Sequence, residues 1–592
     1  MKLDTWPNLV TMLHEQVQAK GDAPFLWGKV EDAYRPTSWR QAADQVNALA
    51  RALRSYGLQP GDRVVLVSEN APHWAIADFA IMAAGGVSVP AYTTNTARDH
   101  AHILADSGAR FAIVSTAALA APLLQAAASA MSLERVIAIE EPEGGGGDAV
   151  IRWQAALDEG ANGEGDPLAE AASIGADSLA CLIYTSGTGG APKGVMLSHR
   201  AMLANCVGAY ELLLSLGLDE EVFLSFLPLS HSYEHSCGLM FPIAIGAEIY
   251  YAERVETLTT NLLEARPTVM TAVPRLYELM RGRILQDVKR QGGFKEKLFW
   301  RAVKLGRKAY EDPDAMGWFE RLDNAIVDKV VRNKVRGRFG GRLKALVSGG
   351  APLNTEIGIF FTALGLRLLQ GYGQTEAAPV ISCNTPDLIK LHTVGPPTAG
   401  TEVRIADDGE ILVRGPLLMD GYWNLEEETA AALKDGWLHT GDIGVIDDDG
   451  YIEITDRKKD IIVISGGDNV SPQRVEGILA LEPEIEQAMV MGDQRPHLVA
   501  LVVPSLEFVT HWARENGKST DLAELAGDKD LHSVLDDAVS RANAQLSVIE
   551  KVRRFAVADG AFTVENEMMT PTMKLRRHQI LERYGERLEA LY

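Results

Sequence analysis

The sequence predicts an α/β protein in which a large domain of mostly parallel sheets precedes a smaller α+β domain. At 592 residues and 64.3 kDa the chain exceeds a single core of roughly 100–200 residues, so at least two domains are expected. Short apolar runs alternate with longer helical patterns through the first three quarters, which is typical of βαβ units. After Gly436 the pattern changes to short strands with tight turns, as at 447–450.

Three strand–helix pairs illustrate the alternation. In each, β-branched and apolar residues come first and a pattern with helical spacing follows. The predicted strands and helices are 63–67 with 73–84, 110–114 with 117–130, and 179–184 with 200–214. Because parallel strands need a crossover connection, helices between strands predict a mostly parallel sheet.

Residues from about 281 to 342 interrupt this alternation with a strongly charged helical segment. Phe294, Leu298 and Phe299 recur at helical spacing and predict an apolar face. A helical hairpin inserted in the large domain is the favoured interpretation, and a membrane-docking surface is the alternative. We expect the N-terminal domain to cover 1–456 and the C-terminal domain 457–592.

The composition is that of a globular protein and argues against nucleic-acid-binding and membrane-spanning proteins. Hydrophobic residues make up 46% and charged residues 23% of the chain, as in soluble domains. The net charge of −23 argues against nonspecific nucleic-acid binding, which uses Lys and Arg against phosphates. The uncharged stretch 111–133 is rich in Ala and broken by Pro122, so a strand and a helix are expected rather than a membrane span.

Cysteine usage and the N-terminus favour a cytoplasmic protein. The four cysteines show no Cys-x-x-Cys spacing, so neither a zinc site nor a disulfide framework is indicated. Asp4 and Pro7 fall where a signal peptide needs an uninterrupted apolar core.

The strongest local motif is 184–194, Tyr-Thr-Ser-Gly-Thr-Gly-Gly-Ala-Pro-Lys-Gly, which directly follows an apolar strand. Its glycines let backbone amides converge on an anion, its hydroxyls add donors, and Lys193 adds charge. The motif therefore predicts a polyphosphate-binding loop. A Walker A loop needs Gly-Lys-Ser/Thr, whereas here Pro192 precedes the lysine and Gly194 follows it, which excludes a P-loop NTPase.

Four further stretches follow in the order of a known family. They are Gly-Tyr-Gly-Gln-Thr-Glu at 371–376, Thr-Gly-Asp at 440–442, Asp-Arg-Lys-Lys-Asp at 456–460, and Thr-Pro-Thr-Met-Lys-Leu-Arg-Arg at 570–577. With the loop, they resemble the superfamily of AMP-forming acyl-CoA synthetases, luciferases and nonribosomal-peptide adenylation domains, and most of all its long-chain fatty acid–CoA ligases. The resemblance extends from Trp39 to Lys574. It implies the adenylate-forming fold, with stacked mixed sheets, flanking helices and a mobile C-terminal domain.

The resemblance also implies a two-step activity. A fatty acid, ATP and Mg²⁺ would give acyl-AMP and pyrophosphate, and the acyl group would then pass to CoA. Lys574 is the expected catalytic lysine, because a fixed ammonium stabilises negative charge that gathers at the α-phosphorus. Glu376 and Thr185 are the expected Mg²⁺ ligands and belong with His231 to the catalytic set. Lys459 lies at the hinge about which the small domain would rotate between the steps.

The nucleotide ligands follow from the same resemblance. Tyr372 would offer its ring face to adenine, Thr375 would contact the α-phosphate, and Asp442 would accept hydrogen bonds from both ribose hydroxyls. The full set of expected nucleotide-binding residues is Thr185, Ser186, Gly187, Thr188, Lys193, Gly350, Ala351, Gln370, Gly371, Tyr372, Thr375, Asp442 and Arg457.

Several features leave alternatives open. His235 occupies the position that gates the fatty-acid tunnel in long-chain members, but a histidine in an apolar stretch is as readily a hydrogen-bonded core residue. Gly189 replaces the family's usual second threonine, and Val463 stands where many long-chain members carry lysine.

Two other functions and three further properties remain as expectations. The chain could be an acyl-AMP ligase or acyl-carrier-protein synthetase, or a noncatalytic nucleotide- or lipid-binding relative, which would be expected to have lost Glu376 or Lys574. Peripheral contact with the inner face of a membrane is plausible because the substrate partitions into lipid, although no polybasic segment supports it. A homodimer is expected only by family analogy.

Overall fold

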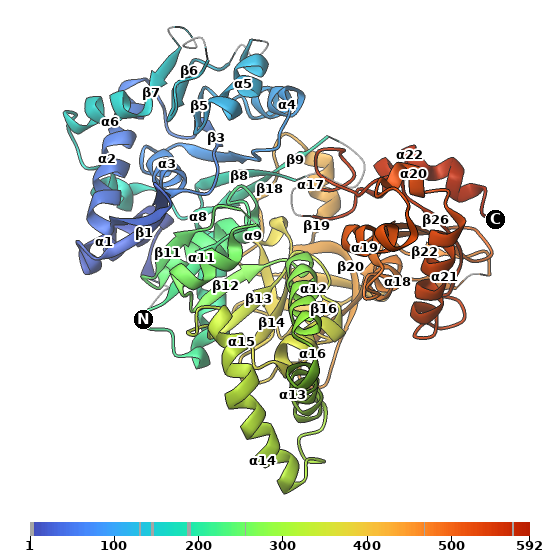
Figure 1. The fold of residues 1–592 in the computed structure, drawn as a ribbon. Coiled ribbons are helices and arrows are strands. Elements are labelled where there is room, and N and C mark those ends of the chain that lie inside the picture. Colours follow the sequence, from blue (N-terminus) through green and yellow to red (C-terminus); the bar gives the residue numbers. More distant parts are fainter. Residues whose placement is uncertain are drawn as a thin grey trace.

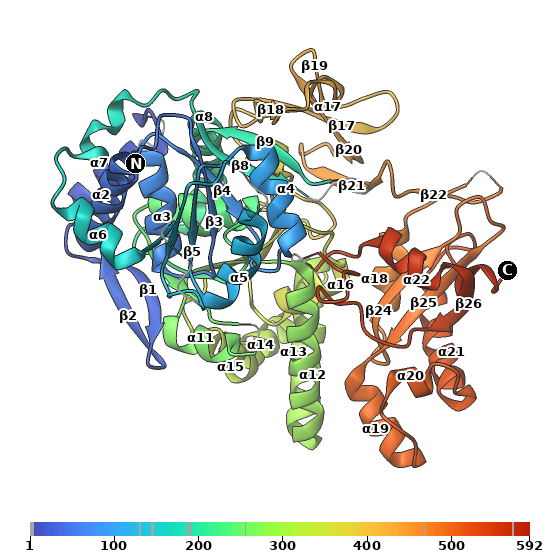
Figure 2. The ribbon, with the colours of Figure 1, turned by 90° about the horizontal axis from the view of Figure 1, so that it is seen from above.

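The computed structural model describes residues 5–128, 132–143, 147, 149–185, 191–254, 256–466, 468–570 and 573–592. In this part of the chain, two eight-stranded sheets and a smaller five-stranded sheet form the large N-terminal region. A compact α+β unit follows and lies to one side of it (Figures 1 and 2). The α/β class predicted from the alternation is therefore confirmed.

The first large sheet is parallel except at its two edges. In spatial order its strands are β15 (Val380–Cys383), β14 (Leu368–Gly373), β13 (Ala345–Ser348), β12 (Val269–Ala272), β10 (Val222–Ser225), β11 (Glu248–Tyr251), β1 (Pro24–Val30) and β2 (Ala33–Ser38). Only the β14–β15 and β1–β2 pairs are antiparallel. The carboxyl ends of the six parallel strands therefore share one edge, where α/β sheets commonly bind ligands.

The second large sheet contains the three strands predicted above. Its order is β18 (Gly421–Tyr422), β9 (Lys193–Ser198), β8 (Leu179–Thr185), β4 (Val87–Ala91), β3 (Arg63–Val67), β5 (Phe111–Val114), β6 (Arg135–Ala138) and β7 (Val150–Arg152). The helices predicted to follow them are present as α3 (Pro72–Ala83), α5 (Ala117–Ala127) and α8 (His199–Leu213). The sequence did not predict β9, which pairs antiparallel to β8.

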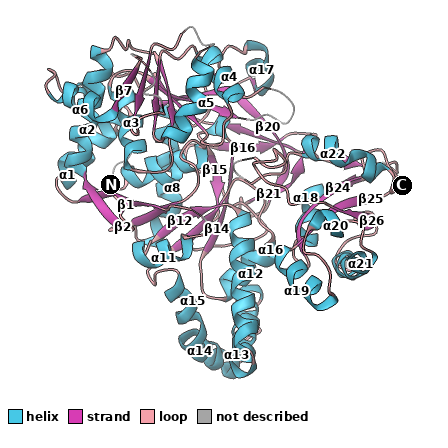
Figure 3. Ribbon diagram, turned by 45° about the horizontal axis from the view of Figure 1, so that its top comes forward, coloured by secondary structure: helices cyan, strands magenta, loops and turns pink. Residues whose placement is uncertain are grey.

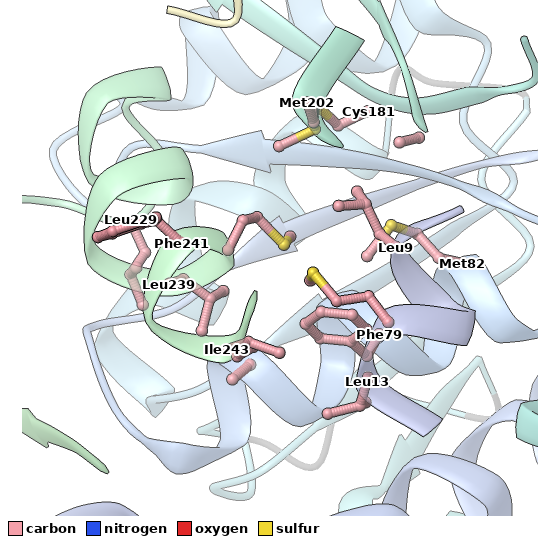
Figure 4. Packing of buried hydrophobic residues seen from close by; sticks show 14 of the residues in the cluster. Leu9, Leu13, Phe79, Met82, Cys181, Met202, Leu229, Leu239, Phe241 and Ile243 are labelled. Atoms are coloured by element: carbon pink, nitrogen blue, oxygen red, sulfur yellow. Dashed lines mark hydrogen bonds between the residues drawn. The ribbon is translucent and has the colours of Figure 1, made fainter. Parts of the chain in front are cut away.

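Helices and sheets alternate in layers because each strand buries both faces. On β3, Val64 and Leu66 join the core between the two sheets, whereas Val65 and Val67 face the outer helices. The inner layer holds α1 (Leu9–Lys20), α2 (Trp39–Ser55), α3 and α8. Figure 4 shows side chains of α1, α3 and α8 in this cluster, among them Leu9, Phe79 and Met202. Outer helices are α4 (Ala97–Ser107) and α5 on the second sheet, and α11 (Leu258–Ala265) and α16 (Thr355–Ala363) on the first. Shorter helices are α6 (Trp153–Ala161), α7 (Pro167–Glu170), α9 (Ser232–Glu234), α10 (Phe241–Ala244) and the π-helix His235–Met240.

The segment expected to be helical is a projecting hairpin. It consists of α12 (Pro274–Gln291), α13 (Gly293–Glu311), α14 (Trp318–Val327), a π-helical turn (Asp328–Arg332) and α15 (Asn333–Arg338). Figures 1 and 3 show α13 and α14 extending beyond the sheets. No helix among the described residues is long and apolar enough to cross a bilayer.

The five-stranded sheet connects the large region to the C-terminal unit. It comprises β16 (Glu402–Ile405), β17 (Glu410–Arg414), β20 (Trp437–Ile446), β19 (Leu433–Lys434) and β21 (Ile452–Arg457), with α17 (Glu426–Ala432) beside it. The antiparallel register of β20 and β21 sets Asp442 opposite Arg457. The domain boundary predicted at 456/457 falls at the end of this last strand and stays a prediction.

The C-terminal unit has its own core on both faces of one small sheet. That sheet consists of β24 (Ile485–Met491), β25 (Leu498–Pro504) and β26 (Val552–Val557), whereas β22 (Ile462–Val463) and β23 (Asn469–Val470) form a separate two-stranded sheet. On one face of β24–β25–β26 pack α18 (Pro472–Leu479), α19 (Leu506–Asn516) and α21 (Lys529–Asn543), with α20 (Leu522–Leu525) at its margin, and on the other packs α22 (Arg577–Glu589). Arg275 binds Glu486 at 2.9 Å, and Asn354 donates to the Gly477 carbonyl at 3.1 Å. These contacts tie the unit to the large region.

Candidate active site

The ends of the predicted phosphate loop are held by a β-hairpin. Thr185 closes β8 and Lys193 opens β9, and the two residues are directly paired across the ladder. The ammonium of Lys193 lies 5.0 Å from the centre of the Tyr422 ring, a cation–π contact. Ser186, Gly187 and Thr188 lie outside the described residues.

One cavity of about 2030 Å³ collects most of the predicted site. It lies against the carboxyl ends of β12, β13 and β14 and is closed on the other side by the C-terminal unit. The predicted residues that line it are Thr185, Lys193, His231, Gly350, Ala351, Gln370, Gly371, Tyr372, Thr375, Glu376, Asp442, Arg457, Lys459 and Lys574. Residues almost 400 positions apart in the sequence therefore meet at one surface.

Asp442 is the centre of a hydrogen-bonded triad. The Tyr372 hydroxyl donates to its Oδ2 at 2.6 Å, and Arg457 Nε donates to its Oδ1 at 2.9 Å. Burial, together with the Asp442 carboxylate, raises the pKa of Tyr372, so its hydroxyl stays a donor. A carboxylate has about four acceptor positions, which leaves capacity on Asp442 for the two hydroxyls of a ribose.

Glu376 is oriented by a residue that the sequence did not single out. The Tyr422 hydroxyl donates to Glu376 Oε1 at 2.8 Å, while the neighbouring Thr375 hydroxyl bonds Ser232 at 2.8 Å. No group of three or more His, Cys, Asp or Glu side chains in the described chain forms a metal cage. Mg²⁺ commonly takes only one or two carboxylates and completes its shell with phosphate oxygens and water. Glu376 and Thr185 fit such an ion.

Lys574 enters the cavity from the C-terminal unit. Its backbone N–H donates to Thr570 Oγ1 at 3.0 Å, and its carbonyl accepts from the Thr570 N–H at 2.8 Å, so two hydrogen bonds fix its backbone beside Thr570. Burial and the charge of Arg457 lower the pKa of Lys574 to about 8, against the opposing effect of Asp442 and Glu376. An ammonium therefore faces the nucleotide side of the cavity at neutral pH.

His231 is a neutral hydrogen-bond donor. Burial and the nearby Lys574 ammonium lower the pKa of His231 to about 3. Its Nδ1 accepts from the Tyr233 N–H at 3.1 Å, so the proton of the neutral ring is on Nε2. The side chain lines the cavity and can donate to an oxygen of a bound acid.

Apolar side chains of the first sheet also line the cavity. Val269 begins β12 and Val273 directly follows it, and both line the cavity; the four residue steps between them span about 13 Å at roughly 3.3 Å per residue. Phe223, Leu212 and Leu213 add apolar surface at the amino ends of the strands. These side chains offer the hydrocarbon chain of a fatty acid an apolar surface to pack against.

His235 does not lie at this cavity. It is 1% exposed and its Nε2 bonds Asp78 at 2.9 Å, with the Trp74 ring against it. His235 belongs to a π-helix packed between the large sheets, so it is placed as a hydrogen-bonded core residue. The gating prediction has no geometric support here.

The hinge segment follows β21 directly. Lys459 is exposed and lines the cavity, while its neighbour Lys458 is fixed by Asp408 at 2.7 Å. Val463, on β22, is 42% exposed.

Sequence reasoning missed two residues that organise the site, Tyr422 and Arg275. Neither belongs to a recognisable motif, and their partners Glu376 and Glu486 are 46 and 211 positions away. Only the tertiary contacts identify them.

Comparisons with known proteins agree with this geometry. Residues 13–423 match the family described as AMP-binding enzyme, and residues 459–592 match the AMP-binding enzyme C-terminal domain. This chain belongs to the AMP-binding enzyme family. Long-chain-fatty-acid–CoA ligase FadD15 of Mycobacterium bovis and of Mycobacterium tuberculosis are each 35% identical to it, over 99% of this chain and 97% of theirs.

A solved structure shows the same fold. The adenylation domain of a carboxylate reductase from Mycobacterium chelonae has a TM-score of 0.80 and 22% identity, and the match covers 100% of this chain and 92% of that one. The adenylate-forming fold implied by the motifs is therefore confirmed.

Proposed function

We propose that this chain is an AMP-forming long-chain fatty acid–CoA ligase that uses ATP and Mg²⁺. The observation that carries the proposal is that Lys574, the Asp442 triad and Glu376 line one cavity together with apolar side chains of the first sheet. The FadD15 relatives, which carry the name long-chain-fatty-acid–CoA ligase, match along nearly the whole chain. A noncatalytic relative is disfavoured because Glu376 and Lys574 are both present and both line the cavity.

In the first step, a carboxylate oxygen of the fatty acid attacks the α-phosphorus of ATP, the bond to the β-phosphate oxygen breaks, and pyrophosphate leaves. Lys574 stabilises the negative charge that gathers on the α-phosphate. Asp442 and Tyr372 hold the ribose and base, and His231 orients the acid through Nε2–H. Mg²⁺, held by Glu376 and Thr185, would neutralise phosphate charge.

In the second step, the CoA thiolate attacks the acyl carbon, the bond to the AMP oxygen breaks, and acyl-CoA and AMP are released. We propose that the C-terminal unit first rotates about Lys459 and withdraws Lys574, since both steps use the same acyl carbonyl end. Such domain motions take microseconds to milliseconds.

Two measurements test the activity. Pyrophosphate release and thioester formation are followed with ATP, Mg²⁺, CoA and acids from acetate to long-chain fatty acids, beside Lys574→Ala. We expect thioester formation to peak on long chains and pyrophosphate release to be lost in the variant. Pyrophosphate release without acyl-CoA would indicate that the acyl acceptor is a carrier protein or another nucleophile. Inactivity with every acid would refute the proposal.

The hinge is tested separately. Lys459→Pro should leave acyl-AMP formation largely intact while thioester formation falls, because proline restricts the backbone rotation that the second step needs. Equal loss of both steps would contradict a hinge at this residue.

We further propose a cytoplasmic enzyme that contacts the inner face of a membrane peripherally. Its apolar substrate partitions into lipid, which favours this location. A homodimer remains a prediction that sedimentation would decide.

A further inference from the structure

The α12–α15 hairpin has a charge opposite to that of the rest of the chain. Residues 281–342 contain seventeen Lys or Arg and eight Asp or Glu, a formal charge of +9, whereas the whole chain carries −23. The remaining residues therefore carry −32. The positive charges are spread at helical intervals, so no contiguous polybasic run is visible in the sequence. These residues lie on α12–α15, the π-helical turn, the connections between them and the loop that follows α15.

One side of α14 and of the π-helical turn that follows it exposes an apolar stripe. It comprises Trp318, Phe319, Leu322, Ile326 and Val330, which are 66%, 67%, 56%, 53% and 42% exposed. Trp318, Leu322, Ile326 and Val330 recur every four residues, and Phe319 lies three residues before Leu322, so these side chains share one face. The opposite face is already buried, since Val327 and Val331 pack against α13. A surface helix normally has one apolar face, so the second one marks an interaction site.

A basic stripe on α13 adjoins the apolar one. Lys297, Arg301, Lys304 and Lys308 recur at intervals of three or four residues on this helix. Arg301 bonds Asp323 of α14 at 2.6 Å, and Lys308 bonds Glu320 of α14 at 2.6 Å. These ion pairs join the two helices along their common border, whereas Lys297 and Lys304 form no ion pair with any described residue. We name the two stripes together the α13–α14 face.

The chemistry of this face suits the surface of an anionic bilayer. Trp and Phe are favoured where lipid headgroups meet the acyl region, and Lys and Arg at the same level attract anionic lipids. A second copy docking through the same face would bring two segments of +9 together, which disfavours a symmetric dimer here. The hairpin also begins at the site: Pro274 and Glu278 of α12 line the cavity.

We propose that the α13–α14 face docks the enzyme on membranes that contain anionic lipid. This inference rests on the peripheral membrane contact proposed above and assigns it to named residues. Trp318, Phe319, Leu322 and Ile326 insert at the headgroup level, and the α13 lysines neutralise lipid phosphates. Figures 1 and 3 show α13 and α14 projecting beyond the sheets, away from the core of the large region.

The test is co-sedimentation of the full chain with two kinds of vesicle, phosphatidylcholine alone and phosphatidylcholine with phosphatidylglycerol. Leu322→Glu/Ile326→Glu should reduce binding to the mixed vesicles more than about tenfold, because two apolar anchors become repelling charges. Lys297→Glu/Lys304→Glu should reduce binding to the mixed vesicles and remove its salt dependence. The matched control is Val548→Glu, at a site 71% exposed on the C-terminal unit, which should bind as the wild type does.

The outcomes distinguish the docking face from membrane contact in general and from the ligase activity. All variants should form thioester from a short, water-soluble acid at the wild-type rate without vesicles, which shows that they fold. If the wild type binds and both hairpin variants bind equally well, the α13–α14 face is not the docking surface, although membrane contact stands. If the wild type binds neither vesicle, both membrane proposals fail while the ligase activity is unaffected. If the hairpin variants change the sedimented mass of the free protein instead, the face contacts a second copy.

Discussion

Lys574 is expected to lose its proton, and the enzyme its first half-reaction, as the pH rises through about 8. Burial and the Arg457 charge lower the pKa of this lysine to about 8, from the ordinary 10.4 or so. The sign follows directly: the ammonium is the active form, so activity is present below the lowered pKa and lost above it. About nine tenths of Lys574 is charged at pH 7 and about one tenth at pH 9, so adenylation falls roughly tenfold between them. A lysine with an ordinary pKa would lose less than about a twentieth of its charged form between pH 7 and pH 9, so adenylation would hardly change.

The assay is kcat/KM for ATP in pyrophosphate release at saturating fatty acid, because kcat/KM reports the ionisation of the ATP-free enzyme. Bound triphosphate should raise the pKa of Lys574, so kcat should fall only at higher pH. Lys574→Arg is the matched variant: its guanidinium stays charged, so its weaker activity should show no fall near pH 8. A wild-type profile that stays flat to pH 9.5, or an arginine variant that titrates like the wild type, would refute this reasoning.

Three further perturbations test the contacts around the cavity. Tyr422→Phe removes the hydroxyl that donates to Glu376. The Mg²⁺ concentration for half-maximal adenylation should rise about tenfold, while the melting temperature stays unchanged. An unchanged Mg²⁺ titration would contradict the role of Tyr422 in positioning Glu376. Arg275→Ala removes the ion pair with Glu486. It should slow acyl-AMP formation roughly tenfold, the effect of losing one charged hydrogen bond, but it should spare thioester formation from added acyl-AMP. Equal slowing of both steps would show that Arg275 does not favour this domain orientation. Gly395→Ala should lower the free energy of unfolding in urea by more than about 3 kcal/mol, because φ is +81° and a Cβ would meet the Cys383 carbonyl carbon at 2.0 Å. The matched control is Gly450→Ala, with φ of +79° and no described atom within 4 Å of the added Cβ. It should lower the same free energy by only about 1 kcal/mol.

Local sequence patterns were reliable where neighbouring residues decide the outcome. The strand 63–67 and the helix beginning near residue 73 were predicted from apolar spacing, a pattern that is set within a few residues. The antiparallel β9 was missed, since a glycine-rich loop can precede either a helix or a returning strand. Its pairing with β8 is a contact between segments rather than a local preference.

The sequence by itself determined the candidates, because its five motifs match those of the family in kind and in order. Lys574, Glu376 and Asp442 were identified through that resemblance. The tertiary structure alone decided which of the candidates meet: Asp442 lies beside Tyr372, whereas His235, only four positions beyond His231, faces the core and Asp78. It also decided that dispersed lysines and an apolar stripe share one projecting face. Side-chain direction and burial depend on packing partners hundreds of residues away, and the spacing of residues along the chain carries no record of them.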